Sequence, residues 1–142
     1  MIDIKCNKEI ILNKIQQAHK ISNFSLLPVS KLVAVSKKQE DYKIDEAIKL
    51  GQKVFGENRV QEAQKRWEKR LEIYKDIELR LIGPLQTNKT RQALNLFDVI
   101  ETIDREKLAK EISKNFNNSI VDFILSKYEI SIPFWNIQLL IG

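Results

Sequence analysis

The chain has 142 residues, of which 43% are hydrophobic and 30% charged, the composition of a soluble globular protein with one sizeable core. Its single cysteine, Cys6, excludes an internal disulfide and a cysteine-based metal cage, and its single histidine, His19, falls on an expected surface helix, which argues against a Ser-His-Asp triad. The net charge of +5 comes from basic residues that are mixed with acidic ones along the chain, so we expect no nucleic-acid partner.

The sequence carries no signal for a membrane or for export. No window approaches the roughly 18 consecutive apolar residues of a membrane-spanning helix. The N-terminal residues also lack the apolar segment of a signal peptide. We therefore expect a cytoplasmic protein with no membrane partner.

The spacing of apolar residues predicts an alternation of helices and strands over the first 115 residues. In chain order, the expected elements are a helix over 7–21, a strand over 32–37, a helix over 41–50, a strand over 53–56, a helix over 60–74, a strand over 79–83, a helix over 87–96, a strand over 97–102 and a helix over 105–115. Asp41 and Thr87 are the expected helix caps, and Gly51 is the expected helix end.

The last part of the chain is less regular, with a possible short helix over 120–128 and a strand over 133–142. Strands that alternate with helices predict an α/β fold with a parallel sheet. A (β/α)8 barrel needs eight such units and typically about 250 residues, whereas this chain supplies about five. We therefore expect the N-terminal part of a TIM-type barrel, incomplete and C-terminally truncated, folded as one domain over residues 1–142.

A lysine closes the first predicted strand, directly after the apolar run Leu32-Val33-Ala34-Val35. Ligands of parallel α/β folds bind at the carboxyl ends of the strands, where Lys37 is expected. A partly desolvated lysine amine at such a place can form an imine with an aldehyde. The alternative is a lysine that extends into solvent past the end of the strand.

Three further segments, taken together with the segment that contains Lys37, resemble a known protein family. In order and separation, the segments 33–37, 54–62, 82–89 and 97–105 resemble the pyridoxal phosphate homeostasis family, also called the proline synthetase co-transcribed homologue family. The resemblance implies a barrel similar to that of alanine racemase. It also implies that Lys37 holds pyridoxal 5'-phosphate (PLP) as an aldimine, a Schiff base, with Asn58 lining the same barrel mouth. The alternative role of Asn58 is to cap the following helix.

The resemblance further implies a function in intracellular PLP homeostasis rather than catalysis. Such a protein would carry and release the cofactor, with possible transient contact to PLP-dependent apo-enzymes. One alternative is a racemase-like PLP enzyme, which generally needs a second acid/base group opposite the lysine. The tyrosines Tyr42, Tyr74 and Tyr128 are all expected on helices or on the surface.

A second alternative is a non-functional remnant of the family. The chain departs from the family pattern at Gln39 and Glu40, where a lysine and a proline are usual. Ser- and Gly-rich loops that hold the cofactor phosphate in the family have no counterpart in this chain. Arg80 stands where the family usually has a histidine, and we expect it to pair with Glu57 or Glu101.

Overall fold

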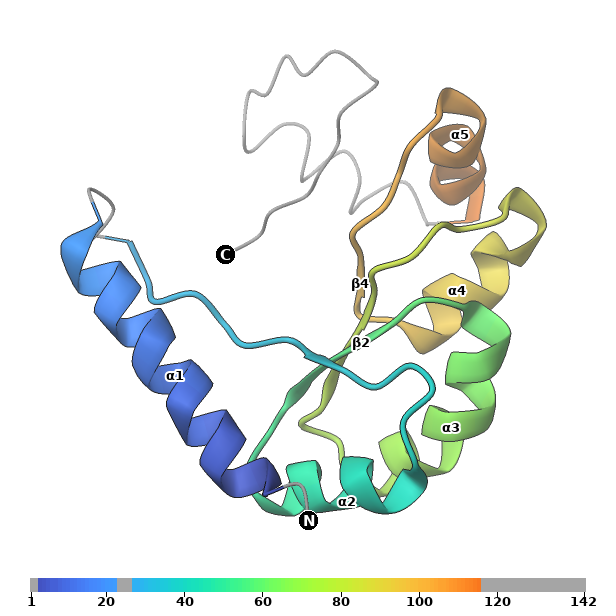
Figure 1. Cartoon of the computed structure of the whole chain (residues 1–142). Helices are drawn as coiled ribbons and strands as arrows, with labels where there is room; N and C mark the ends of the chain where they lie inside the picture. Colours follow the sequence, from blue (N-terminus) through green and yellow to red (C-terminus); the bar gives the residue numbers. More distant parts are fainter. Residues whose placement is uncertain (1–2, 23–26, 116–142) are drawn as a thin grey trace.

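A computed structural model describes residues 3–22 and 27–115 of the chain. Its core is a four-stranded parallel sheet in the order β1-β2-β3-β4, with helices in the connections (Figure 1). In chain order the elements are α1 (Ile4–Ile21), β1 (Ala34–Val35), α2 (Asp41–Lys49), β2 (Val54–Glu57), α3 (Val60–Ile73), β3 (Glu78–Leu81), the 3-10 helix η1 (Thr87–Lys89), α4 (Thr90–Leu96), β4 (Val99–Ile100) and α5 (Glu106–Asn115).

The strand order is the order of a barrel rather than of an open doubly wound sheet. Each strand pairs with the next one in the chain, and no crossover reverses the direction of winding. Figure 1 shows α2, α3, α4 and α5 following one another around one side of the sheet. The predicted fold class, part of a TIM-type barrel, is therefore confirmed for the described residues. The strand predicted over 133–142 and the short helix over 120–128 lie outside them.

The helix-covered face of the sheet holds the hydrophobic core. Leu79 and Leu81 of β3 and Phe55 of β2 are almost completely buried against the helices. Trp67 of α3 is fully buried and packs its ring against that of Phe55, with ring centroids 4.7 Å apart. Ala93 of α4 is also fully buried, and its small side chain is typical of a helix packed closely on a sheet.

The opposite face, which we call the inner face, is more polar. Strand pairing places Val35, Gly56, Arg80 and Val99 in one row across the four strands. Val35 is 44% exposed in this row, so the described residues leave much of its side chain uncovered. Because side chains alternate along a strand, the residues next to this row point to the helices.

Arg80, in the middle of the inner face, is only 8% exposed. Its guanidinium donates to Glu101 at 3.1 Å and also binds Glu78 of its own strand. The predicted pairing with Glu101 is thus confirmed, whereas pairing with Glu57 is wrong. Gly56 is the register partner of Arg80, so the side chain of the following residue, Glu57, points to the helix-covered face.

Several predicted boundaries are wrong for local reasons. The first helix begins at Ile4 rather than at residue 7, because the Asp3 side chain accepts a hydrogen bond from the Cys6 amide and caps it. Glu40 rather than Asp41 is the N-cap of α2, while Asp41 forms an ion pair with Arg70. Gly51 follows the end of α2 with a φ of 77°, as predicted for a helix end.

The outer strands are shorter than predicted, and the fourth helix starts differently. Strands β1 and β4 have two residues each, and within the described ranges each pairs with one neighbour only. Thr87 opens a 3-10 turn instead of capping an α-helix, and its carbonyl accepts a hydrogen bond from the Thr90 hydroxyl. In the part of the chain that the structure describes, no helix is both long and apolar enough to cross a membrane.

Candidate functional site

Lys37 lies in a tight turn at the carboxyl end of β1, the place that the sequence predicts. The turn is closed by a hydrogen bond of 3.1 Å from the Gln39 amide to the Ser36 carbonyl. Lys38 adopts a φ of 57°, which is unusual for a residue with a side chain. Lys37 itself is exposed, so the expected partial desolvation of its amine is wrong for the described residues.

The residue before Lys37 is buried and tied to the second strand. Ser36 is 3% exposed, and its amide donates to the Gly56 carbonyl at 3.0 Å. The Ser36 hydroxyl donates to the carboxylate of Glu57 at 2.7 Å. One end of the lysine turn is therefore fixed to the end of β2, while the lysine side chain extends into solvent.

Asn58 follows β2 and lies at the same end of the sheet. It is half-buried, and it closely approaches the end of the third strand. A Cβ atom on Gly83 would lie only 2.4 Å from the Asn58 carbonyl oxygen, so this position has room for glycine alone. The N-cap of α3 is Arg59, with no side-chain cap bond, which contradicts the alternative role of Asn58 as the helix cap.

A residue between β4 and α5 holds the loop after β3 in place. Leu85 is almost fully buried, and its carbonyl accepts a hydrogen bond of 2.7 Å from Arg105. Arg105 also reaches the Thr87 hydroxyl at 3.4 Å. This arginine precedes α5, so the loops after β3 and β4 are joined at the carboxyl ends of the strands.

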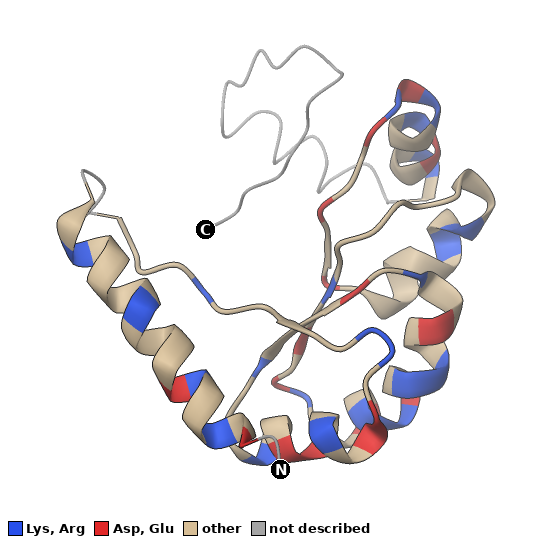
Figure 2. Cartoon of the chain, viewed as in Figure 1, with Lys and Arg blue, Asp and Glu red and all other residues tan. Residues whose placement is uncertain are grey.

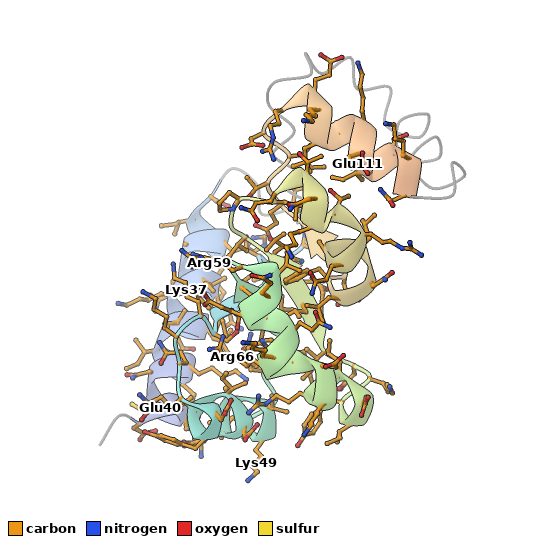
Figure 3. The ribbon with its side chains drawn as sticks, turned by 90° about the vertical axis from the view of Figure 1, so that its right-hand side faces the viewer. Lys37, Glu40, Lys49, Arg59, Arg66 and Glu111 are labelled. Carbon is orange, nitrogen blue, oxygen red and sulfur yellow. The ribbon has the colours of Figure 1, made fainter. Side chains whose placement is uncertain are left out.

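The residues at these strand ends suit an aldehyde cofactor in two respects. Lys37 supplies a primary amine, and Asn58 supplies an amide. Figure 3 labels Lys37, as well as Arg59 at the N-cap of α3 and Arg66 in the middle of that helix. Among the described residues, no group of three His, Cys, Asp or Glu side chains is arranged to hold a metal ion.

A concave surface that Lys37 does not line lies between α2 and α3, with charges of both signs along it. Arg70 spans it by binding Asp45 at 2.8 Å and Asp41 at 3.0 Å. The hydrogen bond that Arg70 donates to the Asp45 carboxylate is the largest influence on its pKa and raises it, while burial of the guanidinium opposes that rise. Figure 2 shows basic and acidic residues interspersed along these helices, as expected for a solvated surface.

Glu57 and Arg105 make contacts at the site that the sequence did not predict, since it offered Glu57 only as a possible partner of Arg80. Both lie inside the segments that carry the family resemblance, at 54–62 and 97–105, and that position was the available signal. The fully buried state of Glu57 could not be read from its local sequence, because carboxylates are rarely buried without partners.

No family model matches the chain. Curated proteins do: it is 43% identical over 114 residues to the pyridoxal phosphate homeostasis protein of Buchnera aphidicola subsp. Schizaphis graminum, covering 80% of this chain and 49% of that protein. It is 40% identical over 116 residues to the protein of the same name from Vibrio cholerae, covering 80% and 49%. For Aquifex aeolicus, the identity is 39% over 102 residues, covering 71% and 44%. The chain thus spans about half the length of the curated relatives it matches.

Solved structures agree with these matches. PipY of Synechococcus elongatus PCC7942, solved with PLP bound, is 41% identical with a TM-score of 0.57, covering 64% of this chain and 43% of PipY. A protein of unknown function from Bifidobacterium adolescentis is 26% identical with a TM-score of 0.66, covering 87% of this chain and 54% of that protein. The resemblance indicated by the sequence motifs is confirmed, and this chain is a relative of the pyridoxal phosphate homeostasis proteins, similar to them over about half their length.

Proposed function

We propose that this chain binds pyridoxal 5'-phosphate through Lys37 and takes part in PLP homeostasis. The observation that carries the proposal is the position of Lys37, in a turn at the carboxyl end of a parallel strand, next to Asn58 at the end of the neighbouring strand. The names of the relatives and the PLP bound to PipY support the same ligand.

When bound, PLP supplies an aldehyde, which condenses with a primary amine and releases water. Lys37 provides that amine, and Asn58 provides an amide that can hydrogen-bond polar groups of the ligand. Gly83 allows the backbone of Asn58 to pack closely against the end of β3, and Arg105 holds the adjoining loop. These residues would bind and orient the ligand.

The exposure of Lys37 favours a carrier over an enzyme. An exposed amine would leave a bound ligand accessible to water and to other amines, which suits reversible binding. A racemase-like reaction needs a second acid/base group facing the lysine. Among the described tyrosines, Tyr42 is exposed on α2 and Tyr74 ends α3, while Tyr128 lies outside the described residues.

The remaining parts of the proposal concern the context of the chain. A single domain over residues 1–142 would act in the cytoplasm and pass PLP to apo-enzymes by transient contact. The even mixture of charges in Figure 2 supports a partner other than nucleic acid, because nucleic-acid sites gather basic residues on one face.

A titration with PLP tests the proposal. We expect the purified chain to develop visible absorbance that saturates with added PLP, and Lys37→Ala to abolish the saturable part. Lys38→Ala is the matched control, because Lys38 occupies the same turn and is also exposed. No saturable signal from the intact chain would indicate a remnant that binds no cofactor, and an equal signal from Lys37→Ala would exclude Lys37 as the site.

A further inference from the structure

Glu57 is a fully buried carboxylate that the proposed function does not use. It ends β2 with its side chain on the helix-covered face, among apolar side chains. Three donors converge on one of its oxygens, Oε1: the Ser36 hydroxyl at 2.7 Å, Arg66 at 2.8 Å and the Trp67 indole N–H at 3.1 Å. Glu57 therefore links β1 to two consecutive residues of α3.

The link is costly for the fold. The second oxygen, Oε2, is buried and has no hydrogen-bond partner in the described residues. Arg66 balances the charge, but replacing a buried ion pair with apolar side chains is often neutral or stabilising. Core packing alone thus gives no reason for a carboxylate at this position, and its reason must lie in what it holds.

What Glu57 holds is the first residue of the lysine turn. Ser36 binds Glu57 through its hydroxyl and Gln39 through its carbonyl, so the same residue is fixed to the core and closes the turn. The turn also contains Lys38 in the left-handed region, a conformation that persists only where its surroundings hold it. The hydrogen bond from the Ser36 hydroxyl to Glu57 and the one from the Ser36 amide to the Gly56 carbonyl both oppose relaxation of this turn.

We propose that Glu57 is a positioning residue for the Lys37 amine, acting through Ser36, with the ion pair to Arg66 holding the carboxylate in place. The importance of Lys37 itself rests on the proposed function. The positioning of its amine does not, because the direction of Lys37 is a property of the chain without any ligand. The two ideas can therefore fail separately.

The test measures the reactivity of Lys37 against Lys38 within the same molecule. The intact chain is treated with an amine-acylating reagent over a range of pH, and peptide mass spectrometry gives the ratio of the two acylation rates. We expect Glu57→Gln and Ser36→Ala each to change this rate ratio several-fold. We also expect each variant to change the way the ratio depends on pH. Because both act through one hydrogen bond, the double variant should change it no further.

Glu62→Gln is the matched control, because it removes a carboxylate that is exposed and pairs with Arg59 on the surface of α3. It should leave the ratio unchanged. Far-ultraviolet circular dichroism reports whether each variant is folded, and Ser36→Ala decides the question if Glu57→Gln does not fold. A folded Ser36→Ala chain with an unchanged ratio would overturn the proposal.

Titration of the same variants with PLP separates this proposal from the proposed function. If the intact chain binds no PLP while the rate ratio shifts in the variants, the proposed function fails and the positioning role stands. If PLP binds at Lys37 while the ratio stays constant in folded variants, the positioning role fails and the proposed function stands.

Discussion

The two faces of the sheet differ in the interactions that stabilise them. The helix-covered face is closed by large apolar side chains such as Trp67 and Leu81, both fully buried. The inner face carries Arg80 between two acids and an exposed Val35 in the same row. Stability is thus concentrated on one face. The candidate site lies at the strand ends, where the buried carboxylate of Glu57 connects the apolar face to the exposed lysine turn.

The strongest way to test this division is to remove the largest core side chain. Trp67→Ala deletes a fully buried ring that packs on Phe55 and binds Glu57. We expect a loss of about 3–5 kcal/mol in the free energy of unfolding, since the cavity cannot be refilled by its rigid neighbours. Urea denaturation followed by circular dichroism measures this loss, and a loss below that of any inner-face variant would contradict the division.

Gly83→Ala tests the close approach between the ends of β2 and β3. The new Cβ would meet the Asn58 backbone at 2.4 Å, and backbone cannot move aside as a flexible side chain can. We expect a loss of about 1–3 kcal/mol in the free energy of unfolding, together with weaker PLP binding. Pro84→Ala, at the exposed neighbouring position, is the control. Unchanged stability in the glycine variant would show that the strand ends are looser than described.

Arg80→Met tests the ionic part of the inner face. It keeps much of the side-chain volume but leaves Glu78 and Glu101 without their shared partner. Both acids are partly exposed, and water can replace some of the lost interaction, so we expect a loss of about 1–2 kcal/mol in the free energy of unfolding. A gain in stability would mean that burial of the Arg80 guanidinium destabilises the protein.

The pH dependence of stability tests the ion pair between Arg80 and Glu78 further. Burial acts to raise the pKa of the Glu78 carboxyl, but the hydrogen bond and charge of Arg80, with Lys31 beside it, outweigh burial and lower that pKa. A lowered pKa means that the stabilisation is present at neutral pH and is lost as the pH falls from about 4.3 through the folded-state pKa. Unfolding titrations of the intact chain should show this loss, and Arg80→Met should reduce it.

Val35→Ala should have the smallest effect. Its side chain is 44% exposed on the inner face, so truncation removes few contacts, and we expect a change within about 0.5 kcal/mol in the free energy of unfolding. A loss approaching that of Trp67→Ala, measured by the same urea denaturation, would show that the inner face is covered in solution and would break the comparison.

The alternation of strands and helices could be predicted because apolar spacing depends only on local sequence. The end of α2 at Gly51 was predictable for the same reason. The partners of Arg80 were only half predictable, since the choice between Glu57 and Glu101 depends on the face to which each side chain points. That face follows from strand register, which no local pattern specifies.

The candidate site was likewise only partly predictable from the sequence. The position of Lys37 at a strand end could be predicted from the apolar run before it, whereas its exposure could not, because exposure depends on what the other elements cover. The role of Glu57 as the link between Ser36, Arg66 and Trp67 requires residues brought together by the fold. Burial of a carboxylate is a tertiary property.

The central claim is that Lys37 is the PLP-binding lysine, and chemical trapping tests it most directly. The chain is mixed with limiting PLP and treated with borohydride, which fixes the cofactor on whichever amine holds it, and peptide mass spectrometry locates the label. We predict that the label falls mainly on Lys37, with little on Lys38, its neighbour, which is also exposed. Label spread evenly over the surface lysines, or concentrated on another one, would contradict the claim.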